Sequence, residues 1–251
     1  MTLRVLLWNY LLIVPHLLVV VVFIALLRRR LYRQFPMFFA YIVGEIVQAA
    51  IILPMIYFRS TTGDEYAIAY YVALAVSTAL RFGIIHEVFA HMFRNYTALS
   101  RFGKPLFRWA TVGLLLAGLA LAASAGGHDP RRLMSIVHVL HRAASILQCG
   151  LLIGLFFFSS YLGLSWRSYI FGIALGVGAV ASGDLIAAAI RSQTGYTYNV
   201  FLNYFTMGIY HCSVVVWIFY LLAPERISQY NLKTLPENDL ELWNQELRRL
   251  L

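Results

Sequence analysis

Charged residues are scarce in this chain. They make up 12% of its 251 residues, whereas 61% are hydrophobic. In soluble domains about a quarter of the residues are charged, so this chain has too little polar sequence to cover a soluble enzyme of its size. The mean hydropathy of +0.72 also excludes a disordered protein. The composition therefore predicts a polytopic integral membrane protein, with the lipid bilayer as its first partner.

Acidic residues are the scarcest charged group, with 11 Asp and Glu against 20 Lys and Arg. In a soluble protein this excess would suggest nucleic acid. Here the basic residues fall mainly between apolar stretches, which indicates membrane orientation and no nucleic-acid partner. The two cysteines, Cys149 and Cys212, lie inside apolar runs, so a disulfide framework is not expected. The first apolar run is followed by Arg28, whereas a cleavable signal peptide would have small residues there as its cleavage site. We therefore expect this run to be retained as the first span.

Seven stretches are apolar enough, and long enough, to span a membrane. A spanning helix needs about 20 mostly apolar residues, and unpaired backbone groups are not tolerated in lipid, so each stretch should be helical. The predicted spans are 5–27, 36–58, 66–93, 106–124, 133–160, 168–191 and 199–222. Short links favour an up-down bundle. We predict an all-α transmembrane domain over 1–224, followed by a cytoplasmic tail over 225–251.

The tail after Pro224 has the pattern of an amphipathic helix. Thr234 and Glu237 form a capping box, and apolar residues then recur at helical spacing, at Leu240, Trp243, Leu247 and Leu250. We expect residues 235–251 to lie on the membrane surface. Most Lys and Arg residues fall on the side of the spans that carries Arg28, which predicts an outside N-terminus and a cytoplasmic C-terminus.

Several ionisable residues fall inside the predicted spans. Such residues are costly in lipid and are functional candidates by default. Residues three, four or seven positions apart share a helix face, and this spacing places polar stripes on five of the spans. We predict that these stripes turn inward and line a polar, hydrated pocket. The candidate ligand-binding residues are Glu45, Arg81, His138, His141, Arg142, Asp184, Asn203 and His211.

Depth in the membrane suggests partners for four of these residues. At about 1.5 Å of rise per residue, Glu45 and Arg81 fall at similar depths on consecutive spans, and so do Arg142 and Asp184. The sequence therefore predicts two buried ion pairs, Glu45–Arg81 and Asp184–Arg142. The alternative is that polar residues only join helices, each bond contributing about 1 kcal/mol.

A metal or haem site is the least favoured interpretation. The candidate ligands are two pairs at helical spacing, Glu87 with His91 and His138 with His141. Zinc needs three or four protein ligands at one point, and the depths of these residues do not assemble such a set. Hydrogen-bonded or pH-sensing histidines are favoured over metal ligands, and no cofactor is predicted.

Two pairs of short segments are similar in sequence. Gly44-Glu45 begins a segment similar to the one at Gly183-Asp184, and residues 83–86 resemble residues 208–211. The matched spans run in the same direction, as in a parallel 3+1+3 repeat of the kind that some small transporters use. The count of spans and the surface helix also resemble the rhodopsin-type receptor plan in topology, but the seventh span has no lysine to hold retinal.

These features lead to a ranked set of functions. The favoured one is a ligand-binding, receptor-like or sensory protein, because the predicted interior is charged and no stretch of the sequence is suited to a soluble output domain. It would bind a small molecule and act through a cytoplasmic protein partner. The alternative is a small-solute or proton-coupled transporter with a 3+1+3 repeat. An intramembrane metal- or haem-binding enzyme or redox subunit ranks third, because the candidate ligands do not assemble at one depth.

Overall fold

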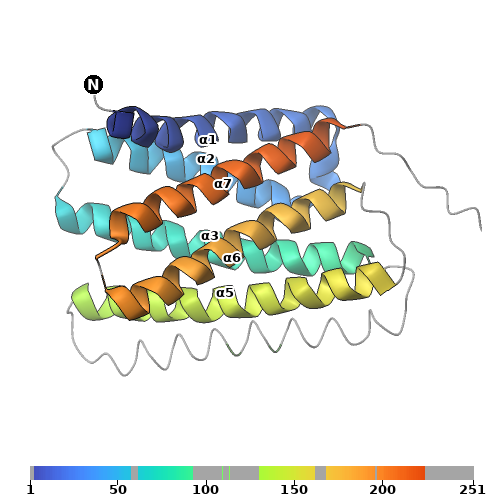
Figure 1. The fold of residues 1–251 in the computed structure, drawn as a ribbon. Coiled ribbons are helices and arrows are strands. Elements are labelled where there is room, and N and C mark those ends of the chain that lie inside the picture. The colour runs from blue at the N-terminus through green and yellow to red at the C-terminus, as the bar shows by residue number, and fades with distance from the viewer. Residues whose placement is uncertain are drawn as a thin grey trace, which may run out of the picture.

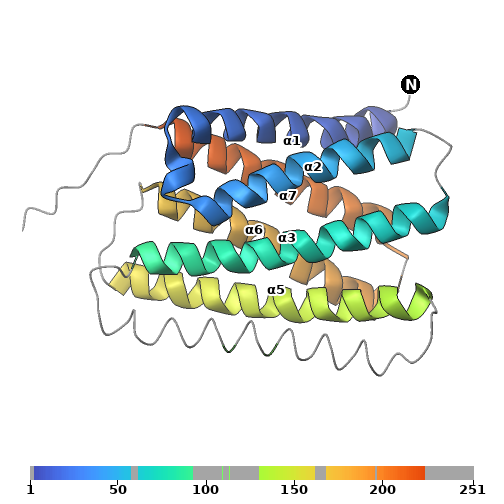
Figure 2. The ribbon, with the colours of Figure 1, turned by 180° about the vertical axis from the view of Figure 1, so that it is seen from behind.

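The described part of the chain is entirely helical. The computed structural model describes residues 3–57, 62–92, 109, 113, 130–161, 168–195 and 197–223. The elements are α1 (Leu3–Arg28), η1 (Leu31–Arg33), α2 (Pro36–Tyr57), α3 (Gly63–Met92), α5 (Pro130–Tyr161), α6 (Tyr169–Thr194) and α7 (Asn199–Leu222). Figures 1 and 2 show them as one bundle, in which α1, α3, α5 and α7 run in one direction and α2 and α6 in the other.

Six of the helices are long and apolar enough to cross a membrane. They match six of the predicted spans, with ends that differ by three residues or fewer. The expected span at 106–124 lies outside the described residues apart from Trp109 and Gly113, and so does the tail helix at 235–251. The six helices give the chain the character of a multi-pass membrane protein.

The sequence marks several helix ends. Before α3, Thr62 Oγ1 accepts from the amide of Glu65, and the Glu65 carboxylate accepts from the amide of Thr62. This reciprocal capping box satisfies amides that the first helical turn leaves unpaired. The hydroxyl of Ser168 accepts from the amide of Phe171 at the start of α6. Gly195, with φ of 63°, closes α6 in the left-handed region that glycine favours.

Charged side chains tie helix ends to neighbouring helices. Glu87 of α3 accepts hydrogen bonds from the amides of Met37 and Phe38, at 3.0 and 3.1 Å. A carboxylate there complements the positive end of the α2 dipole. Arg29 donates to the carbonyls of Leu222 and Ala223, which lie at the negative end of α7. These contacts fix α2 and α7 at the same end of the bundle.

The six helices form a closed ring in chain order. Contacts join α1 to α2, α2 to α3, α3 to α5, α5 to α6, α6 to α7 and α7 to α1, and α3 also contacts α6 across the ring. Figure 1 shows α1 and α5 on opposite sides, with α3 and α6 between them. We call the end that holds Arg29 and Leu222 the basic end, and the end that holds Leu3 and Asn199 the N-terminal end.

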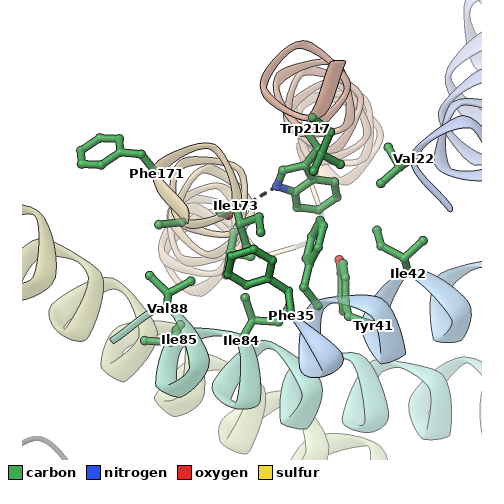
Figure 3. Close-up of a cluster of buried hydrophobic side chains, with 14 of the residues drawn as sticks. Val22, Phe35, Tyr41, Ile42, Ile84, Ile85, Val88, Phe171, Ile173 and Trp217 are labelled. Carbon is green, nitrogen blue, oxygen red and sulfur yellow. Dashed lines mark hydrogen bonds between the residues drawn. The ribbon is translucent and has the colours of Figure 1, made fainter. Parts of the chain in front are cut away.

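The large apolar side chains of the interior gather toward the basic end. Trp217, Tyr41, Phe38 and Phe171 are almost completely buried, and Figure 3 shows several of them side by side between α2, α6 and α7. The Phe38 and Trp217 rings meet edge to face at 5.3 Å, a favourable aromatic geometry. We call this cluster the aromatic core. It closes the basic half of the bundle.

The interior is different toward the N-terminal end. The buried hydrophobic residues described there are Leu12, Ala49, Ala144, Ala187 and Leu202, none of them aromatic. The outer faces of the helices are apolar, with Leu17, Ile68, Ile153 and Phe219 each at least 60% exposed. A surface of this kind is costly in water and suits lipid. The bundle is therefore apolar outside and contains its polar groups within.

Glycines allow α6 to approach α7 closely. A Cβ atom on Gly176 would overlap the indole of Trp217, and one on Gly183 would lie 2.6 Å from Ile209 Cδ1. Trp217 cannot move aside easily, because it is fully buried and donates to the carbonyl of Ile173 at 3.4 Å. The small-residue face of α6 is thus required by the α6–α7 contact.

Gly176→Ala should destabilise the protein by about 1–3 kcal/mol, as expected for overpacking of a filled core. The loss can be measured as a lower free energy of unfolding in mixed micelles. The matched control is Gly154→Ala on α5, where the new methyl group meets open space. Equal stability of the two variants would contradict the proposed close packing.

Candidate polar site in the bundle interior

An ion pair joins α3 to α6 at the centre of the bundle. Arg81 Nη1 donates to Asp184 Oδ2 at 2.7 Å. The Arg81 side chain is 4% exposed, whereas that of Asp184 is 21% exposed. A buried pair of this kind gains attraction in a low dielectric and loses hydration of both charges. Its position explains why α3 and α6 meet across the ring.

His141 of α5 completes this group. Its Nε2 atom lies 3.4 Å from Asp184 Oδ2, and its Nδ1 atom lies 3.0 Å from Thr78 Oγ1. The His141 side chain is 14% exposed. The Gln148 amide of α5 donates to the Thr78 carbonyl at 3.1 Å. Asp184 is therefore held between two basic side chains, and three helices converge on it.

A second polar group surrounds Glu45 of α2. Ser77 of α3 donates to Glu45 Oε1 at 2.8 Å, and the Tyr210 hydroxyl of α7 donates to Oε2 at 3.0 Å. Because both oxygens accept a hydroxyl, the pattern fits an ionised carboxylate. Arg81 is also within electrostatic range of Glu45. We call the two groups together the polar belt, formed by Glu45, Ser77, Thr78, Arg81, His141, Asp184 and Tyr210.

The two predicted ion pairs are wrong. Arg81 pairs with Asp184 in place of Glu45, and Arg142 is exposed. Depth gives a position along a helix but no direction around it. Arg142 follows His141 by one residue, which rotates it about 100° away from the inward face. The contact of α3 with α6 also joins helices that are not consecutive.

Two further predicted site residues lie away from the polar belt. Asn203 of α7 accepts a hydrogen bond from Arg191 at 2.9 Å, near the N-terminal end of the bundle, where α6 ends and α7 begins. His211 lies against α1, where its Nε2 atom is 3.4 Å from the Tyr10 hydroxyl. The structure therefore brings Glu45, Arg81, His141 and Asp184 together. His138 is part of α5, but its side chain lies outside the described residues.

The candidate metal ligands have other roles where their side chains are described. Glu87 caps α2, and His91 Nδ1 donates to the carbonyl of Glu87 at 3.0 Å within its own helix. Among the described residues, no three His, Cys, Asp or Glu side chains are close enough to hold a metal ion. These described residues therefore do not assemble the three ligands that a zinc site needs.

Buried polar atoms beside the belt have unused hydrogen-bonding capacity. Arg81 Nε and Gln148 Oε1 have no hydrogen-bond partner among the described residues, and both side chains are almost fully buried. An unmade hydrogen bond in a buried position costs about 1–3 kcal/mol. One donor and one acceptor are thus left for water or a small polar molecule.

Ser77, Thr78 and Tyr210 belong to the polar belt but are not among the predicted site residues, and Ser77 and Thr78 show why. Serine and threonine within a span usually bond to the backbone of their own helix, as Thr78 does with Leu74 at 2.7 Å. Their spacing from Arg81, four and three residues before it, places both near the face that carries the arginine. That spacing was the available signal.

The chain matches no family model, no curated protein and no solved structure.

Asp184→Asn should lower the free energy of unfolding by about 3–5 kcal/mol, because it leaves the buried Arg81 charge without its partner. The double variant Arg81→Gln with Asp184→Asn should be more stable than Asp184→Asn alone, since neither charge remains. Chemical unfolding in mixed micelles measures both values.

Arg142→Gln is the matched control for this cycle. It removes an arginine that the sequence paired with Asp184 but the structure leaves exposed, so its effect should be within about 0.5 kcal/mol of zero. A loss as large as that of Asp184→Asn would restore the predicted Asp184–Arg142 pair and overturn the assignment of Arg81.

Proposed function

We propose that this protein is a receptor-like or sensory membrane protein that binds a small polar molecule at the polar belt. The observation that carries the proposal is the unequal division of the interior. The aromatic core closes the basic half, whereas the belt lies beyond it, on the side where the described buried hydrophobic residues are small or aliphatic. A site of this design is reached from the N-terminal end.

The exposure of the belt residues supports access from that direction. Asp184 and His141 keep 21% and 14% of their side chains exposed, although both belong to the central group. Trp217 and Phe38 in the aromatic core are fully buried. A small molecule can therefore reach the carboxylate of Asp184, but the core blocks its passage to the basic end.

The unpaired atoms indicate the chemistry of the ligand. Arg81 Nε offers a hydrogen-bond donor and Gln148 Oε1 an acceptor. Arg81 Nη1 is already paired with Asp184, so a simple anion would have to compete with that carboxylate. A small molecule with both accepting and donating groups, such as a hydroxylated or zwitterionic compound, fits better than an anion alone.

Ligand binding at the belt has a direct route to the helices. Asp184, Arg81 and His141 come from α6, α3 and α5, so a ligand that competes for any of them favours a different arrangement of these helices. A ligand shifts such an equilibrium by its difference in affinity for the two arrangements. We propose that a cytoplasmic protein partner detects the shift at the basic end, with the N-terminus outside the cell.

Ser77→Cys should react with a membrane-impermeant methanethiosulfonate reagent, in a background with Cys149 and Cys212 replaced by serine. Ser77 belongs to the belt, so water that reaches Glu45 also reaches the new thiol. The matched control is Ser213→Cys, which is also buried but lies beside the aromatic core. Labelling of Ser77→Cys should be at least about tenfold faster, because a dry, buried thiol is unreactive. Equal rates would contradict a hydrated belt.

A transporter is the second candidate, and one pattern favours it. Glu45 of α2 accepts a hydrogen bond from Tyr210 of α7, and Asp184 of α6 accepts one from Arg81 of α3. Each carboxylate follows a glycine in the two similar segments. In a 3+1+3 repeat, α1 to α3 form the first half and α5 to α7 the second, so each carboxylate bonds to the third helix of the opposite half. This is the relation expected of a parallel 3+1+3 repeat. Transport would require the aromatic core to open.

Proton flux separates these two functions. Proteoliposomes loaded with the pH dye pyranine should show no protein-dependent acidification under an imposed pH gradient, because the aromatic core closes the basic half. Asp184→Asn provides the comparison. Acidification by the wild-type protein that disappears in Asp184→Asn would favour proton-coupled transport and contradict the receptor-like proposal.

A further inference from the structure

The hydroxyl of Thr78 determines which nitrogen of His141 carries a proton. Thr78 Oγ1 lies 2.7 Å from the carbonyl of Leu74, and a carbonyl oxygen can only accept. The single hydroxyl proton is therefore used in that bond. Thr78 Oγ1 can then only accept from His141 Nδ1, 3.0 Å away. The hydrogen bonds assign a proton to Nδ1.

The assignment of Nδ1 leaves Nε2 facing a carboxylate. Nε2 lies 3.4 Å from Asp184 Oδ2. In the neutral ring with Nδ1 protonated, Nε2 would direct a lone pair at a carboxylate oxygen, which is unfavourable. A proton on Nε2 converts this contact into a charge-assisted hydrogen bond. Nε2 is therefore the atom at which a proton binds and leaves.

The charges of the neighbouring helices favour the same proton. On α6, Asp184 is negative, and on α3, Arg81 is positive while Tyr70 interacts electrostatically with Asp184. On α2 and α7, Glu45 is negative and bonded to Tyr210. Arg191 of α6 also lies within electrostatic range of Tyr70. Asp184 is the carboxylate in contact with His141, and its negative charge stabilises a proton on Nε2.

We infer that His141 Nε2 and Asp184 Oδ2 form a binding site for one dissociable proton, with His141 as the imidazolium when the site is occupied. The inference goes beyond the proposed function, because it requires no ligand at the belt. His141 contacts α3 through Thr78 and α6 through Asp184. Release of the proton therefore weakens a junction of three helices.

Nitrogen NMR of ring-labelled histidine in lipid bilayers tests the site directly. His141→Asn identifies the His141 signals by their loss. Nδ1 of His141 should be protonated at every pH measured, and any change in the protonation of the ring should occur at Nε2 alone. A neutral form with the proton on Nε2 and a bare Nδ1 would overturn the inference, and this result requires only the wild-type protein.

Asp184→Asn tests the partner. Without the carboxylate, the Nε2 signal of His141 should change because its charge-assisted partner is gone, while Nδ1 stays protonated by its bond to Thr78. Arg142→Gln, one residue from His141 but exposed, should leave the spectrum unchanged. Identical His141 spectra in the wild type and Asp184→Asn would also overturn the inference. Neither result depends on thiol labelling, so the proton site and the ligand site can fail separately.

Discussion

The arrangement of the bundle depends on one partly buried carboxylate, Asp184, held between Arg81 and His141. Removing a carboxylate and a guanidinium from water costs several kcal/mol per ion, and good geometry only partly offsets that loss. The pair is therefore weak evidence for stability and better evidence for specificity. It selects the register in which α3 meets α6 across the ring, and His141 adds α5 to the same point.

The rest of the interior is consistent with this constraint. Trp217 and Phe38 fill the basic half, so the polar groups are confined to a belt between that core and the N-terminal end. Glu87 and Arg29 fix the ends of α2 and α7 at the basic end through backbone groups. A fixed end and a polar, partly exposed middle are the arrangement that a ligand-responsive bundle requires, because movement can occur at one end while the other is held.

Much of this architecture was predictable from the sequence. Long apolar stretches determine the helices, since lipid leaves the backbone no alternative, and six of the expected spans are confirmed. Helical spacing also predicted that His141 faces inward, and the cost of a charge in lipid marked Asp184 as a site residue. It could not predict which charges pair, because the pairing of Arg81 with Asp184 depends on a contact between helices far apart in the chain. The capping roles of Glu87 and Arg29 were missed for the same reason.

The proposed function requires that water reaches the polar belt while the aromatic core stays dry. Hydroxyl-radical footprinting of the unmodified protein in nanodiscs measures this property, since it reports water beside native side chains. We expect His141 and Tyr210 to be oxidised while Trp217, an intrinsically more reactive residue, is protected. Oxidation of Trp217 with protection of His141 and Tyr210 would contradict it.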